Sequence, residues 1–242
     1  MSEAALVIGA GDATGGAIAK AFATEGYTAC ITRRARHADA LEALAQSIRE
    51  AGNEARAFPS DAREEDEMTA LVDTVEREVG PIGVAVFNIG ANVHFGITET
   101  TAQVYRKVWE MAAFAGFLMG REVAKRMIPR ERGTILFTGA TASLRGGAGF
   151  SAFAGAKAAL RMLAQSMARE LGPKNIHVAH IVIDGGIDTE FVRGLRPDFD
   201  AQKATDGVLS PDAIAAQYVM LHKQHRSAWT HELDLRPWKE TW

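Results

Sequence analysis

Residues 5–16 read ALVIGAGDATGG, which is four apolar residues followed by a glycine-rich turn. An apolar strand that passes through such a turn into a helix is the context in which a glycine cluster binds a dinucleotide pyrophosphate. Glycine lets backbone N–H groups approach the phosphates, and the N-terminus of the helix stabilises their charge. We therefore expect a strand, a phosphate-binding turn and a helix here, with a tight turn of small residues as the alternative.

The rest of the chain repeats this alternation of short apolar runs and longer amphipathic segments, which is typical of βαβ units and a parallel sheet. Strands are expected over 5–8, 28–32, 55–59, 84–88, 134–138 and 177–183, with a last one near 232–235. Helices are expected over 15–25, 39–51, 65–79, 102–127, 150–171 and 211–222. The pattern predicts one Rossmann-like α/β domain over residues 1–242, a doubly wound parallel seven-stranded sheet flanked by helices.

Composition and charge narrow the class of protein. The 242 residues are 47% hydrophobic and 24% charged, which is ordinary for a soluble globular protein. The net charge of −3 argues against nucleic acid or an anionic membrane as a partner. Cys30 is the single cysteine and lies in an apolar run, so we expect a small buried hydrophobe and no internal disulfide. No apolar run reaches the ~18 residues of a membrane span and no secretory start is visible, which favours the cytoplasm.

The end of the second expected strand carries two cations, Arg33 and Arg34, and no acid. NAD-binding sites place a carboxylate at this point to accept hydrogen bonds from the adenosine ribose. A guanidinium instead holds a 2′-phosphate through paired hydrogen bonds. The sequence therefore favours NADP(H) as the cofactor, unless both arginines are simply solvated at the surface.

Gly9, Ala13 and Gly15 stand in a spacing that resembles the Gly-x-x-x-Gly-x-Gly pattern of the short-chain dehydrogenase/reductase family, with alanine at the middle position. After the fourth expected strand, Asn88 and Gly90 match two residues of the family's Asn-Asn-Ala-Gly. The resemblance covers roughly residues 5–235, and it implies a nicotinamide dinucleotide lying across the carboxyl edge of the sheet.

The segment after the sixth expected strand resembles the family's Pro-Gly-x-x-x-Thr, which cradles the nicotinamide; Gly185 and Thr189 match, and Asp184 replaces the proline. The resemblance also places Asp61 near the adenine, where it would alternatively cap the following helix. The cofactor contacts that the resemblance and the glycine turn imply together are Gly9, Gly11, Asp12, Ala13, Thr14, Gly15, Arg33, Arg34, Asp61, Ala62, Asn88, Ile89, Gly90, Thr138, Lys157, Asp184, Gly185, Ile187 and Thr189.

The catalytic positions depart from the family. Its Tyr-x-x-x-Lys pair corresponds to Phe153 and Lys157, which lie one helical turn apart, and phenylalanine has no proton to donate. The family's serine falls on Ala140, and its asparagine falls on Ala112 or, with a shift of one, on Ala113. Of the four expected polar groups, Lys157 alone remains, and the resemblance implies that it holds the ribose of the nicotinamide nucleoside.

A replacement proton donor has two main candidates. Thr141 flanks the position of the missing serine, and its hydroxyl could bind a carbonyl oxygen. His94 follows the fourth strand, and histidine titrates near neutral pH, although an ordinary loop histidine is the simpler interpretation. Ser151, Tyr105 and Asp184 are weaker candidates.

Three functions fit these residues. The first is an NADP(H)-dependent reductase that acts on the carbonyl of a small, mostly apolar substrate with an unusual proton donor. The second is a C=C reductase for enones or enoyl thioesters, because some family members of that kind also lack the tyrosine and keep the lysine. The third is an NADP-binding protein without turnover.

The remaining expectations concern the substrate and the partners. The segment 190–209 resembles a mobile lid over the substrate, with a plain surface segment as the alternative. Family members pair helices like those at 102–127 and 150–171, so we expect a homodimer or homotetramer. The tail ends in Trp238 and Trp242, which we expect to dock on a neighbouring subunit.

Overall fold

The computed structural model describes residues 2–11 and 13–241 and contains a seven-stranded sheet in the order β3-β2-β1-β4-β5-β6-β7, with every neighbouring pair parallel. The strands are β1 Ala4–Ile8, β2 Thr28–Arg33, β3 Ala55–Pro59, β4 Ile82–Phe87, β5 Gly133–Thr138, β6 Ile176–Ile183 and β7 Glu232–Leu235. The strand order reverses between β1 and β4, where open α/β sheets bind their ligands. The predicted doubly wound, Rossmann-like sheet is confirmed.

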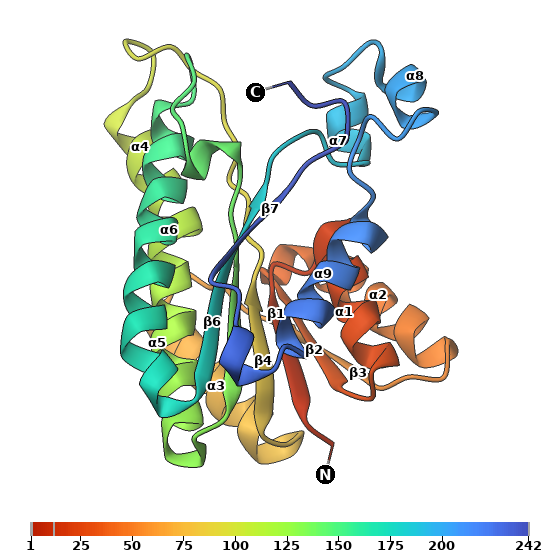
Figure 1. Cartoon of the computed structure of the whole chain (residues 1–242), viewed down its shortest axis with the longest axis vertical. Helices are drawn as coiled ribbons and strands as arrows, with labels where there is room; N and C mark the ends of the chain where they lie inside the picture. Colours follow the sequence, from red (N-terminus) through yellow and green to blue (C-terminus); the bar gives the residue numbers. More distant parts are fainter. Residues whose placement is uncertain (1, 12, 242) are drawn as a thin grey trace.

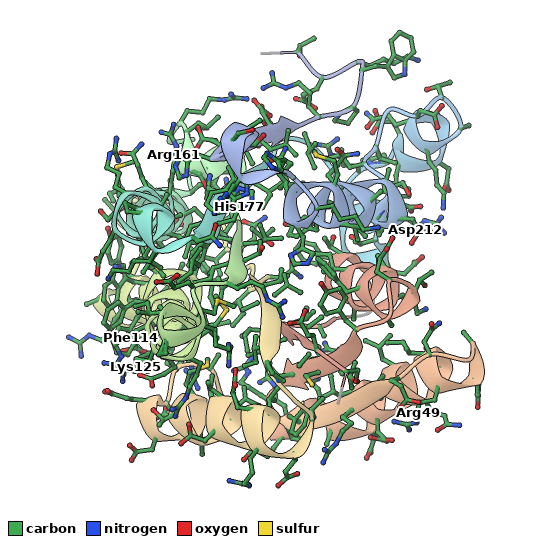
Figure 2. The ribbon with its side chains drawn as sticks, turned by 60° about the horizontal axis from the view of Figure 1, so that its bottom comes forward. Arg49, Phe114, Lys125, Arg161, His177 and Asp212 are labelled. Carbon is green, nitrogen blue, oxygen red and sulfur yellow. The ribbon has the colours of Figure 1, made fainter. Side chains whose placement is uncertain are left out.

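Helices cover both faces of this sheet (Figure 1). α1 (Thr14–Thr24), α2 (Ala38–Glu50) and α9 (Pro211–His222) form one core with the sheet, and α3 (Glu65–Glu78), α5 (Ala115–Met127) and α6 (Ser151–Leu171) form the other. Figure 2 shows the two layers from the bottom, with Phe114 and Lys125 on one side and Arg49 and Asp212 on the other.

Alternation along β1 explains how one strand serves both cores. Leu6 and Ile8 belong to the core under α3, α5 and α6, whereas Ala5 and Val7 belong to the core under α1, α2 and α9. Successive side chains of a strand point to opposite faces, so a strand covered on both faces must be apolar throughout. Cys30 in β2 is fully buried in the core under α3, α5 and α6, as the sequence predicted.

The single helix that we expected over 102–127 is interrupted. α4 (Ala102–Trp109) is followed by a π-helical turn at Glu110–Phe114, and α5 begins after it. Isolated π-helical turns are frequent at functional sites, because the wider turn redirects side chains and backbone groups. Ala112 and Ala113, the two candidates for the family's asparagine position, lie in this turn and are buried.

The segment 190–209 forms two short helices, α7 (Glu190–Arg193) and α8 (Phe199–Lys203), beyond the carboxyl edge of the sheet (Figure 1). Phe199 is buried, while Phe191 and Leu195 are exposed. Among the described residues, none of the helices combines the length and the apolar character that a bilayer span requires.

Candidate active site

The glycine turn has the close backbone packing that a phosphate site needs. Gly9 has φ +86°, and a Cβ added at Gly15 would lie only 2.4 Å from the Gly9 carbonyl oxygen. Asn88 Nδ2 donates to the same carbonyl at 3.2 Å and ties the end of β4 to the turn. Among the described residues, no side chain caps the N-terminus of α1 at Ala13, and its first turn holds no acid. Gly16 N donates to Gly11 O at 2.8 Å, and the N–H groups of this turn that make no such bond suit an anion. Asp12, also predicted to contact the cofactor, lies outside the described residues.

A cavity of about 240 Å³ opens beside this turn at the ends of β1, β2, β3 and β4. Predicted cofactor contacts line most of it, namely Gly9, Gly11, Arg33, Arg34, Asp61, Ala62, Asn88, Ile89 and Gly90. Sequence reasoning did not place Ser60, Arg63, His37, Ala91 or Met111 there. The Ser60 hydroxyl oxygen is buried and has no hydrogen-bond partner among the described residues, which fits a cavity that takes up a polar ligand.

Positive charge is in excess around this cavity. Burial lowers the pKa of Arg34, and the neighbouring Arg36 and Arg63 lower it further, while Asp61 raises it. Arg63 Nε and Nη2 donate to the two carboxylate oxygens of Asp61 at 2.9 and 2.5 Å, and this pairing lowers the pKa of Asp61. Asp61 caps no helix, because α3 begins after Glu64. The cationic surroundings of Arg34 would favour a bound anion.

The positions that the family resemblance gives for catalysis meet in one hydrophobic cluster. Phe153 is 8% exposed and packs with Val108, Ala112, Ala113, Ala152 and Ala156, and Ala140, Ala142 and Phe150 lie against the same cluster. Residues from α4, the π-helical turn, the segment after β5 and α6 therefore converge at one place. The fold brings Ala112, Ala113, Ala140 and Phe153 together, and the Ser151 hydroxyl at the start of α6 is buried with no hydrogen-bond partner among the described residues.

Lys157 is the ionisable group beside this cluster. It is 2% exposed, and its Nζ donates to the backbone carbonyls of Ile89 at 2.9 Å and Thr138 at 2.8 Å. Burial lowers the pKa of Lys157 to about 7, because the charged ammonium loses its hydration. The Phe153 ring centre lies 6.0 Å from Nζ. Thr138 takes part through its carbonyl, whereas its hydroxyl pairs with the Tyr218 hydroxyl at 2.7 Å.

Asp184 is a buried carboxylate in the segment that follows β6, with 1% of its surface exposed. Thr141 Oγ1 donates to its Oδ1 at 2.6 Å, and Arg145 Nη2 donates to both oxygens at 3.3 and 3.4 Å. Arg236 Nη2, from the chain after β7, lies 3.6 Å from Oδ2. The expectation that Thr141 donates to a substrate carbonyl does not fit this arrangement, because the Thr141 proton already points at Asp184.

The sequence profile described as short chain dehydrogenase matches residues 3–200. The chain belongs to the short-chain dehydrogenase family. A solved short-chain dehydrogenase from Rhodopseudomonas palustris is 48% identical, with a TM-score of 0.84 over 98% of this chain and 99% of that one. The 7alpha-hydroxysteroid dehydrogenase of Escherichia coli is 30% identical over 193 residues, 80% of this chain and 74% of that enzyme. The 2-dehydro-3-deoxy-D-gluconate 5-dehydrogenase of Formosa agariphila is 30% identical over 174 residues, 72% of this chain and 66% of that enzyme. This short-chain dehydrogenase is thus an oxidoreductase of a family that binds nicotinamide cofactors.

The expected nicotinamide segment of this dehydrogenase is held from both sides. Ile187 forms a parallel bridge with Leu209, and Thr189 accepts from Val192 N at 3.1 Å as the N-cap of α7. Gly185 has φ +153°, and a Cβ there would lie 2.6 Å from Pro237 Cδ. The C-terminal tail therefore packs over this segment, a contact that no motif in the sequence signals.

His94 and the tail lie at the rim of the site. His94 is exposed, and its ring packs edge-on against Phe150, with 4.8 Å between ring centres, and against the backbone of Gly149. Trp238 is 74% exposed, and its Nε1 donates to Thr205 O at 3.0 Å, so it contacts its own chain. Docking of the tail on another subunit stays a prediction, and Trp242 lies outside the described residues.

Proposed function

We propose that this short-chain dehydrogenase is an NADP(H)-dependent oxidoreductase that reduces the carbonyl of a small, mostly apolar substrate. The observation that carries the proposal is Lys157, a buried amine fixed by two backbone carbonyls beside a cluster of carbon. When bound, the cofactor supplies hydride to the carbonyl carbon, and the oxygen takes up a proton to give the alcohol. What the protein has to supply is therefore orientation and that proton.

The preference for NADP(H) is supported by the charges around the adenosine end of the cavity. Arg34 stands among Arg36 and Arg63, and the carboxylate of Asp61 is already engaged by Arg63. A 2′-phosphate between these guanidinium groups would offset their mutual repulsion and form charge-assisted hydrogen bonds. The Ser60 hydroxyl, buried without a partner among the described residues, is a further contact that a nucleotide would satisfy.

Lys157 takes two roles in this proposal. Two of its three N–H bonds go to Ile89 and Thr138, and the third remains for the ribose or for a solvent molecule. Because the pKa of Lys157 is lowered to about 7, its proton can move near neutral pH, which suits a general acid. We infer that the proton reaches the substrate oxygen from Lys157 through solvent, since Phe153 offers no hydroxyl.

A direct experiment follows NADPH absorbance with matched ketones, quinones, aldehydes and enones. Turnover of ketones is the expected result. Tight NADPH binding without turnover of any compound would contradict it and would favour a binding protein. Replacing Phe153 with tyrosine tests the geometry, because a hydroxyl at that ring should raise ketone reduction if the ring lies where the substrate binds.

A C=C reductase is the second candidate, and one observation favours it. The ring at Phe153 carries no hydroxyl, and the Thr141 proton is engaged by Asp184. An enolate formed by hydride addition at a β-carbon needs hydrogen bonds rather than immediate protonation, so Lys157 alone would suffice. Turnover restricted to enones would establish this alternative in place of ketone reduction.

We further propose that the dehydrogenase pairs with a second copy through α4, α5 and α6. Tyr105, Trp109, Phe117 and Met162 expose large apolar side chains on these helices. Light scattering should give the mass of a dimer or tetramer, and Trp109→Glu should lower it without unfolding the chain. A shift to monomer after deletion of residues 237–242 would show that the tail also reaches a neighbouring subunit.

A further inference from the structure

Asp184 joins two separate segments at the rim of the catalytic cluster. Thr141 and Arg145 reach it from the segment after β5, and Arg236 reaches it from the chain after β7. The carboxylate is 1% exposed, so it loses most of its contact with bulk solvent. Asp184 accepts hydrogen bonds from Thr141 and Arg145, and the Arg236 guanidinium adds an ion pair that helps to balance its buried charge.

The contact with Asp184 commits the Thr141 proton. A threonine hydroxyl has one proton to donate and two lone pairs that accept. The distance of 2.6 Å between Thr141 Oγ1 and Asp184 Oδ1 lies in the range of a charge-assisted O–H···O⁻ hydrogen bond. Toward any ligand, Thr141 therefore presents lone pairs and acts as an acceptor.

Thr141 stands beside the catalytic cluster. Its neighbours in the chain, Ala140 and Ala142, both pack against the cluster that contains Phe153. Lys157, on the same helix as Phe153, can only donate in its ammonium form. The site thus combines a donor, Lys157, and an acceptor, Thr141, beside a hydrophobic cluster. A ligand whose only polar group is a carbonyl accepts the hydrogen bond from Lys157. It offers no proton to the Thr141 oxygen, and the two oxygens carry partial charges of the same sign.

We propose that the substrate is an α-hydroxy ketone, whose hydroxyl donates to Thr141 Oγ1. The reverse reaction would then take a vicinal diol. Thr141 is a binding residue in this scheme, and Asp184 is a positioning residue that holds Thr141 as an acceptor. The inference rests on the proposed carbonyl chemistry and adds the substrate class to it.

Calorimetry on the full chain saturated with NADP⁺ tests the inference without requiring turnover. The probes are α-hydroxyacetophenone, acetophenone and α-methoxyacetophenone, which differ in the presence of a hydroxyl donor. One additional hydrogen bond predicts about 5–10-fold tighter binding of the hydroxy ketone than of acetophenone. The methoxy ketone, which cannot donate, should gain nothing. Equal affinities for the hydroxy and the parent ketone would overturn the inference.

Three variants assign the preference to Thr141 and Asp184. Thr141→Val should reduce the affinity ratio of hydroxy ketone to acetophenone to about one, and Thr141→Ser should keep it. In Asp184→Asn, the amide N–H can donate to Thr141, which frees the threonine proton and should favour the methoxy ketone instead. A merely structural defect would weaken all probes alike. If Asp184→Asn does not fold, Thr141→Val and Thr141→Ser still test the proposal. A preference for the hydroxy ketone that survives in Thr141→Val would refute the role of Thr141.

These results separate this inference from the proposed function. NADPH binding with no reduction of any ketone would end the proposal of a carbonyl reductase, whereas the affinity ratio would still report the role of Thr141. Ketone reduction with a ratio of one would keep the proposed function and remove the α-hydroxy ketone as its substrate class.

Discussion

The two halves of the site differ in what fills them. At the adenosine half, glycine backbone, arginine side chains and a buried serine hydroxyl without a partner among the described residues line a cavity of about 240 Å³. At the catalytic half, Phe153, Ala112 and Ala113 pack with one another, and Lys157 is tied to backbone carbonyls. The buried hydroxyls of Ser60 in the first half and Ser151 in the second both lack a partner among the described residues, but in the second half carbon stands at the positions where the family resemblance implies serine, tyrosine and asparagine.

This difference indicates that nucleotide binding and proton donation are separate properties of the fold. Burying an unsatisfied hydroxyl costs free energy, so Ser60 is retained at a cost that a ligand would offset. Phe153 and its alanine neighbours carry no such cost. On the proposed function, the sequence keeps polar groups at the nucleotide end of the site and has phenylalanine at the position where a hydroxyl would give the proton. Each prediction below changes one half and measures whether the other responds.

Restoring the hydroxyl should have the largest effect. Phe153→Tyr places a proton donor one helical turn from Lys157, and a general acid contributes typically 10²–10⁴-fold, so we expect ketone reduction to rise by about that factor. NADPH affinity should stay the same, because the ring lies in the carbon cluster. Steady-state rates with a ketone panel measure the reduction, and fluorescence titration measures the NADPH affinity. An unchanged rate would mean that Phe153 does not face the substrate.

The charge of Lys157 should make stability depend on pH. Its pKa is about 7 in the folded chain against 10.5 as the ordinary value, so between these limits the unfolded chain binds more protons and stability rises with pH. Relative to Lys157→Met, the free energy of unfolding should increase by about 2–3 kcal/mol from pH 7 to pH 9. Urea denaturation of both proteins at the two pH values measures this difference. A difference that does not change with pH would show that the ammonium is well solvated.

Removing a guanidinium should affect the nucleotide half alone. Arg34→Ala should weaken NADPH binding by about 10-fold or more, since hydrogen bonds to charged groups are worth roughly 1.5–3 kcal/mol, and should leave NADH binding unchanged. Arg169→Ala, an exposed arginine at the far end of α6, is the matched control. Equal losses for both nucleotides would place Arg34 away from the 2′-phosphate.

The smallest effect is expected at Ser60. Ser60→Ala should weaken NADPH binding by a few-fold, as expected for one neutral hydrogen bond of about 1 kcal/mol. The free protein should lose no stability, because the hydroxyl has no partner among the described residues. Thermal unfolding with and without NADPH separates the two quantities. A destabilised free protein would mean that Ser60 serves the fold instead.

Much of the fold could be predicted because its signals are local. Strands such as β1 are continuous apolar runs, and the glycine turn announces the helix that follows. The helical run expected over 102–127 has these bounds, but the π-helical turn at Glu110–Phe114 inside it could not be predicted. A single turn with i→i+5 bonds is too short to leave its own apolar period in the sequence, and tertiary packing decides where it forms.

The site was predictable where a motif fixes position and unpredictable where contacts are distant in sequence. Arg34 and Asp61 follow strand ends, so their place at the cavity follows from the sheet. The contact of Arg236 with Asp184 joins the chain after β7 to the segment after β6, and no spacing in the sequence encodes it. Thr141 and Asp184 are likewise far apart in the sequence, so the expectation that the Thr141 hydroxyl could bind a carbonyl oxygen did not include its donation to Asp184.

The most direct test of the account is calorimetric titration of the pure protein with NADPH and, in parallel, with NADH. A site lined by Arg33, Arg34 and Arg63 with no acid at the end of β2 predicts that NADPH binds at least about 10-fold more tightly, because only NADPH carries the 2′-phosphate. Absence of heat with both nucleotides, or tighter binding of NADH, would contradict it.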